Sequence, residues 1–312
     1  MLRVIHPIPS GTRDVLPDEM RELRVITEAF RSVFESSGYG EIATPALEYE
    51  TVLTRGDPAA ADPAYKLFDE HGNVLVLRSD MTIPIARVVS SRYGNAEPPL
   101  RFCYFAHAYR SVRPQRGQAR EMLQAGLELI GAPGPDGTAE ALTVLARGLE
   151  AAGLENYRIG LGDASLYPRL LDRIGVPAGA RPQILHELVS RDFVGLEREV
   201  AVHGHEDLVR VPQLRGGVEV LDDVPEAESL RAVYDRVAPE VAERVIFDLG
   251  LIRSLGYYTG AVFEVYDSAL GAPIGGGGRY DDLLQRFGRD LPACGWALNV
   301  ERLHLARVGE GG

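Results

Sequence analysis

The sequence is poor in cysteine and has no long apolar run. Only two of its 312 residues are cysteines, Cys103 and Cys294, too few for a disulfide framework or a zinc site of their own. Both stand among apolar residues, so we expect buried thiols. No apolar stretch is long enough to span a bilayer, and the first residues, MLRVIHPIPSGTRD, lack the apolar block of a signal peptide. The sequence predicts a globular, cytoplasmic protein without membrane contact.

Positively charged residues are outnumbered by negatively charged ones. The chain has 33 Lys and Arg against 45 Asp and Glu, which gives a net charge of -12. This balance argues against broad nonspecific nucleic-acid binding, although a local basic patch could still contact phosphate. A hydrophobic content of 45% is sufficient for a packed core in one large domain or two modest ones.

Two common cofactor signatures are missing. The glycines of YRIGLG at 157–162 are followed by Ser165 instead of the third glycine of a dinucleotide fingerprint. His203 and His205 could in principle hold a metal, but they lack the further ligands of a metal site, so a solvated loop is the favoured interpretation. We expect no cofactor and no metal.

Against this acidic background, residues 100–131 contain five arginines. Residues 100–110 have the length and aromatic content of a strand, and residues 121–130 form a second candidate strand. Pro114 and Gly117 mark a polar turn between the two. We predict an antiparallel hairpin.

The two faces of this hairpin differ in chemistry. Period-two alternation places Gln124, Gly126 and Glu128 on one face of the second strand and Leu127 and Leu129 on the core face. On the first strand one face carries Ala106, Ala108 and Arg110. If the polar faces coincide, the small residues leave a hollow for a small zwitterion, because a carboxylate can bind an ammonium and a guanidinium a carboxylate or phosphate. The alternative is a solvated basic hairpin.

Three other segments have competing interpretations. LRSDMT places Asp80 and Thr82 before a predicted helix, where either would serve as an N-cap. LIRSLGYYTG carries Tyr257 and Tyr258, and adjacent tyrosines usually pack in a core, although the flanking glycines allow a ring to line a cavity. GGGGRY at 275–280 permits close approach of a ligand or another strand.

Six segments together resemble, in the same order, the signatures of histidyl-tRNA synthetase catalytic domains. They are PIPSGTRDVLP, LRSDMT, YRSVRPQRGQAREMLQAGLELIG, LIRSLGYYTGAVFEVY, GGGGRYDDLL and CGWALNVERL. The resemblance implies an α+β fold of the class II aminoacyl-tRNA synthetase type, with an antiparallel sheet flanked by helices. It implies a core formed by residues 1–165 and 245–312, a helical insertion at 166–244, and no C-terminal anticodon-binding domain.

The resemblance also implies a binding site for free histidine. The matching positions are Asp80, Thr82, Gln124, Glu128, Arg253, Tyr257 and Tyr258. In the family, the counterparts of Gln124 and Glu128 hold the amino group, that of Arg253 lies beside the carboxylate, and those of the tyrosines surround the imidazole.

The ATP half of the family's site is altered in this sequence. Arg110 and Arg302 match phosphate-binding arginines, so we expect a residual anion or phosphate site. The departures are Val112 for a glutamate that contacts adenine, Gln118 for an arginine, Asn299 for a glycine, and Leu255-Gly256 for a Gly-Asp pair. These changes predict a site that holds histidine but is poorly equipped to activate it.

Such departures resemble the non-catalytic paralogues that serve as regulatory subunits of ATP phosphoribosyltransferase in histidine biosynthesis. The implied role is to activate a short-form catalytic subunit and to mediate feedback inhibition by histidine, with no catalytic residue in this chain. The implied partners are that catalytic subunit, free histidine, and a second copy of the chain in a homodimer within a hetero-octamer, with no tRNA and no membrane. Two alternatives stay open: a truncated histidyl-tRNA synthetase or histidine-activating enzyme, and a structural role with a vestigial pocket.

Overall fold

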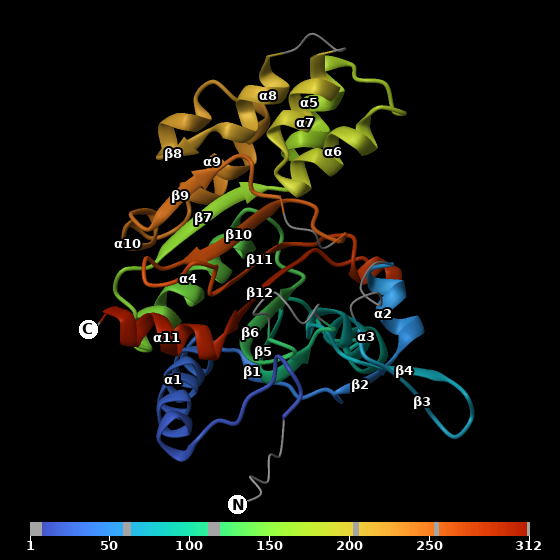
Figure 1. Cartoon of the computed structure of the whole chain (residues 1–312), viewed down its shortest axis with the longest axis vertical. Helices are drawn as coiled ribbons and strands as arrows, with labels where there is room; N and C mark the ends of the chain where they lie inside the picture. The colour runs from blue at the N-terminus through green and yellow to red at the C-terminus, as the bar shows by residue number, and fades with distance from the viewer. Residues whose placement is uncertain (1–7, 59–63, 112–118, 202–205, 253–255, 311–312) are drawn as a thin grey trace, which may run out of the picture.

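The computed structural model describes residues 8–58, 64–111, 119–201, 206–252 and 256–310. It shows one large sheet, one small sheet and helices packed around both (Figure 1). The strands are β1 (Gly40–Glu41), β2 (Leu47–Tyr49), β3 (Lys66–Phe68), β4 (Val74–Leu77), β5 (Leu100–Tyr109), β6 (Glu121–Ile130), β7 (Arg158–Asp163), β8 (Arg215–Gly216), β9 (Val245–Asp248), β10 (Ala261–Tyr266), β11 (Gly275–Arg279) and β12 (Ala293–Asn299). The α-helices are α1 (Pro17–Ser36), α2 (Glu50–Gly56), α3 (Thr82–Arg92), α4 (Asp136–Ala151), α5 (Leu166–Ile174), α6 (Arg181–Ser190), α7 (Phe193–Ala201), α8 (Asp207–Arg210), α9 (Glu228–Tyr234), α10 (Pro239–Ala242) and α11 (Val300–Glu310). The short 3-10 helices are η1 (Val211–Gln213), η2 (Val218–Leu221), η3 (Pro225–Ala227) and η4 (Leu284–Phe287).

The large sheet is mixed. Within the described residues it has nine strands in the order β1-β5-β6-β12-β11-β10-β7-β9-β8. Most neighbours are antiparallel, but β1 pairs with β5 and β7 pairs with β9 in parallel. The expectation of an antiparallel sheet is therefore wrong for these two pairs. In both, a long stretch of chain separates the partners, as the crossover between parallel strands requires.

The predicted hairpin of β5 and β6 is confirmed. The two strands pair in antiparallel register along their whole length, from Leu100 opposite Ile130 to Tyr109 opposite Glu121. Leu127 and Leu129 are fully buried on the side of the main hydrophobic core, as the alternation predicts.

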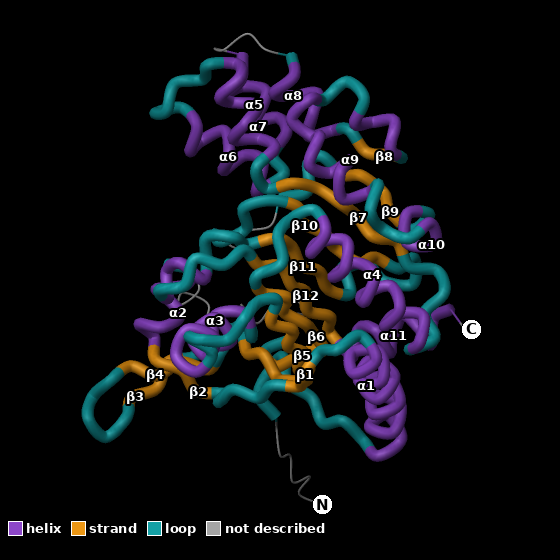
Figure 2. The backbone as a smooth tube through the Cα atoms, turned by 180° about the vertical axis from the view of Figure 1, so that it is seen from behind, coloured by secondary structure: helices purple, strands orange, loops and turns teal. Residues whose placement is uncertain are grey.

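Helices α1, α4 and α11 pack on this core face of β6 and β12. Figure 2 shows α1 and α4 on the rear of the sheet, and α1 packs against both α4 and α11. The Trp296 ring of β12 packs against Phe30 and Phe34 of α1, with centroids 6.1 and 5.6 Å apart, and its Nε1 donates to the Ala141 carbonyl of α4 at 2.9 Å. Both cysteines are buried, as expected. The ligand-binding site described below lies on the opposite face of the sheet.

The small sheet, in the order β2-β4-β3, forms a unit with α2 and α3. β1 belongs to the large sheet and β2 to the small one, and Pro45 lies between these two strands. Leu53 of α2, Val76 of β4 and Ile83 of α3 form a small apolar core of their own. This unit positions the beginning of α3 beside the large sheet.

Between β7 and β9 the chain is mainly helical, with α5 to α10 and the edge strand β8. Helices α5 to α8 lie at one end of the molecule (Figure 1). The buried carboxylate of Asp163 on β7 accepts hydrogen bonds from Arg169 of α5 and Ser229 of α9. These bonds join the helices to the sheet.

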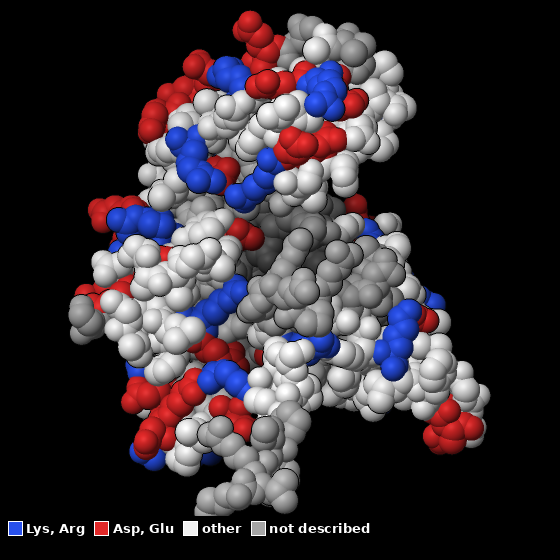
Figure 3. Space-filling model, viewed as in Figure 1, with Lys and Arg blue, Asp and Glu red and all other residues white. Residues whose placement is uncertain are grey.

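On the face shown in Figure 3, acidic and basic side chains are intermixed, and neither sign gathers into a large patch. Nonspecific nucleic-acid binding uses a continuous basic surface, which this face does not offer within the described residues.

Candidate ligand-binding site

A cavity of about 210 Å³ opens where β6, β11 and β12 meet the beginning of α3 and the tyrosine loop after residue 256. Drug-sized ligands usually occupy cavities of about 300–1,000 Å³, so this one suits a molecule of amino-acid size. The lining residues from the predicted set are Asp80, Thr82, Arg110, Gln124, Tyr257, Tyr258 and Arg302. The structure thus brings together residues that lie more than 200 positions apart.

Glu128 lies against the cavity wall formed by Gly295 and is only 1% exposed. Its Oε1 accepts a hydrogen bond from the Thr82 hydroxyl at 2.8 Å, and its Oε2 accepts one from the Tyr280 hydroxyl. Burial raises the pKa of Glu128 to about 8, and the two hydroxyl donors only partly oppose that rise. At neutral pH the carboxyl is therefore mostly protonated unless a donor or cation stabilises its charged form.

Asp80 is a second buried carboxyl at the cavity. Its Oδ1 accepts the Ile83 amide at 3.3 Å, so it supports the first turn of α3 and lines the cavity at the same time. Burial raises its pKa, while the Ile83 amide and the nearby Arg110 guanidinium lower it. The N-cap of α3 is Met81 and Thr82 is the first helical residue, so the prediction that Asp80 or Thr82 is the N-cap is wrong. Asp80 supports the first turn from one residue earlier, and this contact is compatible with ligand binding.

Gln124 and the tyrosines complete the inner part of the cavity. The Oε1 atom of Gln124 is buried and has no hydrogen-bond partner within the described part of the chain, which makes it an acceptor available to a ligand N–H. The Tyr257 ring lies 5.0 Å from that of Tyr258 and 5.7 Å, edge-on, from that of Tyr280. Tyr257 is thus both a core residue and a cavity wall.

Arg110 and Arg302 lie where the cavity meets a wider hollow of about 640 Å³, since both line the two spaces. Arg302 is exposed and donates from Nη1 to the Pro273 carbonyl at 2.6 Å. Asn299 lines both spaces as well, but its Oδ1 accepts the Arg302 amide at 2.8 Å and so caps α11. The site combines buried carboxyls with guanidinium groups, which suits a small zwitterion.

One part of the sequence prediction is wrong. The sequence predicts a hollow over Ala106, Ala108 and Gly126, but none of these residues lines the cavity. In the strand register Tyr104 lies opposite Gly126, and its ring fills the space that a side chain there would occupy. The room for a ligand is provided instead by glycines of β11 and β12.

Some site residues lie outside the sequence prediction or outside the described structure. Tyr280 was part of the GGGGRY segment, but its bond to Glu128 depends on the pairing of distant strands and was not predicted. Arg253, Val112 and Gln118 lie outside the described residues, as do His203 and His205.

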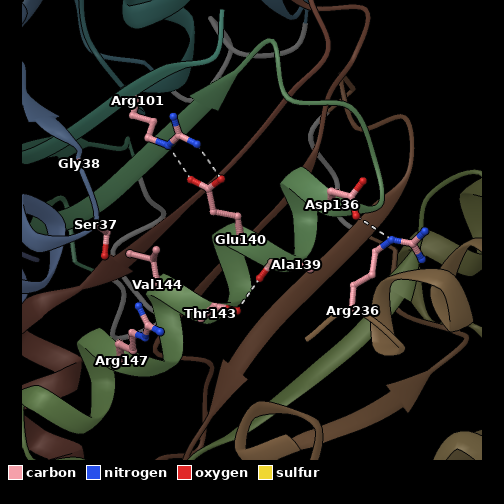
Figure 4. A pocket seen from close by; sticks show the side chains of 10 residues that line it. All are labelled: Ser37, Gly38, Arg101, Asp136, Ala139, Glu140, Thr143, Val144, Arg147 and Arg236. Carbon is pink, nitrogen blue, oxygen red and sulfur yellow. Dashed lines mark hydrogen bonds and ion pairs between the residues drawn. The ribbon is translucent and has the colours of Figure 1, made fainter. Parts of the chain in front are cut away.

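A second concave region, of about 530 Å³, lies along α4 (Figure 4). Its charged groups largely pair with one another. Arg101 binds both carboxylate oxygens of Glu140 at 2.7 and 2.9 Å, and Arg236 binds Asp136 at 2.7 Å. These pairs join β5 and the segment after α9 to α4, so we assign this region a structural role.

No cluster of His, Cys, Asp or Glu suited to a metal occurs among the described residues.

Burial raises the pKa of Cys103 to about 11 and that of Cys294 to about 12, so neither thiol is reactive at neutral pH. In the described segments, no helix has the length and apolar character needed to cross a bilayer.

The mixed sheet, its flanking helices and the cavity on its open face define a protein of the class II tRNA synthetase fold. The chain matches the family described as Histidyl-tRNA synthetase over residues 11–303. The solved structure of an ATP phosphoribosyltransferase regulatory subunit/histidyl-tRNA synthetase from Bacillus halodurans superposes with a TM-score of 0.89 at 30% identity, covering 97% of this chain and 84% of that one. A histidine–tRNA ligase subunit from Alicyclobacillus acidocaldarius gives 0.79 at 31% identity, covering 100% and 99%.

Relatives in sequence narrow the assignment. The ATP phosphoribosyltransferase regulatory subunit of Moorella thermoacetica is 40% identical, covering 96% of this chain and 82% of that protein. The protein of the same name from Symbiobacterium thermophilum is 38% identical, covering 97% and 80%. The chain belongs to the histidyl-tRNA synthetase-like family of ATP phosphoribosyltransferase regulatory subunits, as the sequence resemblance predicted.

Proposed function

We propose that this chain is a non-catalytic regulatory subunit that binds free histidine, is required by a short-form catalytic subunit of ATP phosphoribosyltransferase, and transmits feedback inhibition by histidine. The observation that carries the histidine part is the cavity, which is lined by the buried carboxyl of Asp80 and adjoined by that of Glu128. These carboxyls and the unpartnered Gln124 Oε1 are acceptors for the N–H groups of a ligand. Histidine offers an ammonium, an imidazole N–H and a carboxylate, so its donors match the acceptors and its carboxylate matches a guanidinium.

The proposed histidine site consists of Asp80, Thr82, Gln124, Glu128, Arg253, Tyr257 and Tyr258. The first three and the tyrosines line the cavity, and Glu128 adjoins it. Arg253 is included on the sequence resemblance alone. Arg110 and Arg302 form the residual anion site at the junction with the wider hollow.

Regulation follows from a coupling free energy between two binding events. If histidine binds one conformation of the subunit more tightly, it shifts the population that the catalytic partner meets. The assembly we propose is a homodimer of this chain within a hetero-octamer, in the cytoplasm, without tRNA.

The primary test is calorimetry of the purified chain with histidine and with histidinol, which lacks the carboxylate. We expect histidine to bind and histidinol to bind at least tenfold more weakly. Activity of a short-form catalytic subunit, measured with and without this chain and across a histidine titration, tests the partner role. Absence of histidine binding would leave only a structural role.

A second candidate function is histidine activation by a synthetase-like enzyme. Arg110 and Arg302 favour it, because they border a hollow large enough for a nucleotide. Histidine-dependent exchange between ATP and pyrophosphate decides the question: sustained exchange by the isolated chain would refute the non-catalytic role.

A further inference from the structure

The loop that carries the two cavity tyrosines is anchored by a residue far away in the sequence. Asp57 directly follows α2 and is 3% exposed. Its Oδ2 accepts the backbone N–H of Gly256 at 3.2 Å, across a separation of 199 residues. Tyr257 and Tyr258 come immediately after this amide.

The same carboxylate occupies the space beside Gly256 where a side chain would lie. A Cβ atom built on Gly256 would be 3.2 Å from Asp57 Oδ1 and 3.8 Å from Oδ2. Gly256 is not among the glycines with positive φ, so its backbone can accept an L side chain. The glycine at 256 and the aspartate at 57 are therefore spatially complementary.

The end of α2, which directly precedes Asp57, is well packed. The preceding Gly56 carbonyl accepts a hydrogen bond from Arg286 of η4, and Gly56 itself packs closely against Ile83 of α3. Leu53, one turn earlier in α2, is fully buried in the small apolar core. The acceptor of the Gly256 amide is therefore attached to a well-packed part of the chain.

We propose that Asp57 is a positioning residue of the ligand site: it fixes the backbone at Gly256 so that Tyr257 and Tyr258 face the cavity. The inference rests on the proposed histidine site, because the effect on binding is read out there. Asp57 does not line the cavity, and it acts through the loop.

Three variants separate positioning from a general structural effect. Asp57→Ala removes the acceptor of the Gly256 amide, and we expect histidine to bind about tenfold more weakly because this buried hydrogen bond is lost. Asp57→Asn retains an acceptor oxygen, so its affinity should stay within about threefold of the parent value. Gly256→Asp alone places two carboxylates in one space and should weaken binding by about tenfold or more.

The decisive protein is the double variant Asp57→Ala/Gly256→Asp. The carboxylate on residue 256 then enters the space that Asp57 has left, and we expect histidine affinity to return to within about threefold of the parent protein, a strongly non-additive result. Asp69→Ala is the matched control, because Asp69 also accepts backbone amides, those of His71 and Asn73, in the β3–β4 turn. It should leave histidine binding unchanged.

Hydrogen exchange of the amides at 256–260 in the ligand-free protein gives an independent measurement. We expect exchange about tenfold faster in Asp57→Ala, close to parental in Asp57→Asn, and unchanged in Asp69→Ala. If the parent binds histidine but Asp57→Ala binds it equally well, or if exchange in the loop is unaltered, the positioning role is overturned. If the parent fails to bind histidine, the proposed function falls, and exchange alone decides whether Asp57 anchors the loop.

Discussion

The Glu128 carboxylate lies directly against Gly295 of the neighbouring strand. The two residues are paired in the register of β6 and β12, and a Cβ atom on residue 295 would collide with Glu128 Oε2 and with the Leu127 carbonyl. Glycine at this position is therefore what allows a carboxylate to lie flat on the sheet at the cavity. The position of the acceptor and the absence of a side chain opposite it form one structural feature.

Gly295→Ala should accordingly displace Glu128 and weaken histidine binding by at least tenfold, measured by calorimetry. Gly271→Ala is the matched control, because a Cβ there meets nothing within 4 Å. Both variants add one methyl group to a glycine, so equal affinity in the two would contradict the role assigned to Gly295.

Glu128→Gln should stabilise the free protein at alkaline pH. Burial raises the pKa of Glu128 from 4.5 to about 8, so between these values the folded chain holds a proton that the unfolded chain has lost, and stability falls as pH rises. Glutamine removes this loss. We expect thermal unfolding to show a difference of about 1 kcal/mol or less at pH 5 and an advantage on the order of 4 kcal/mol for the variant at pH 9. A constant difference from pH 5 to pH 9 would mean that Glu128 does not titrate in this range.

Histidine binding near pH 7 should release protons. N–H donors from the ligand stabilise the charged form of Glu128, whose pKa of about 8 leaves it mostly protonated beforehand. Calorimetry in buffers of different ionisation enthalpy should show release of up to about one proton per site, decreasing toward pH 8.5. Binding enthalpies that do not depend on the buffer at pH 7 would contradict this protonation state.

Local patterns in the sequence were sufficient to predict the β5–β6 hairpin. Alternation placed Leu127 in the core and Gln124 and Glu128 on the other face, and the structure agrees. The prediction of a hollow over Gly126 is wrong because the strand register places Tyr104 opposite this glycine. The register depends on both strands and cannot be read from one of them.

The remaining site features depend on contacts between distant segments. Gly295 meets Glu128 only through the pairing of β12 with β6, and Asp57 meets Gly256 across 199 residues. Neither relationship leaves a periodic signal in either segment alone. The parallel pairs of the sheet were missed for the same reason, since periodicity within one strand does not specify the direction of its neighbour.

Arg101→Ala should lower stability without affecting the ligand site. Arg101 binds Glu140 through two hydrogen bonds beside α4 (Figure 4), and both side chains are 32% exposed. Partial exposure limits the effect to about 1 kcal/mol in the free energy of unfolding. Denaturant unfolding measures the loss, and calorimetry should return the parental histidine affinity. A change in that affinity would indicate that the region along α4 communicates with the cavity.

Tyr258→Ala should separate inhibition from activation in the complex with the catalytic subunit. Tyr258 lines the cavity and packs against Tyr257, so its truncation removes part of the ligand's aromatic wall. The histidine concentration for half-inhibition should rise about tenfold or more, since loss of an aromatic contact costs about 1 kcal/mol beyond the buried area. Activation at zero histidine should stay within about twofold of the parental value, because the ligand contact is not needed to bind the partner. Enzyme assays with and without histidine measure both quantities on one preparation. Parallel loss of activation and inhibition would show instead that Tyr258 maintains the fold on which the partner depends.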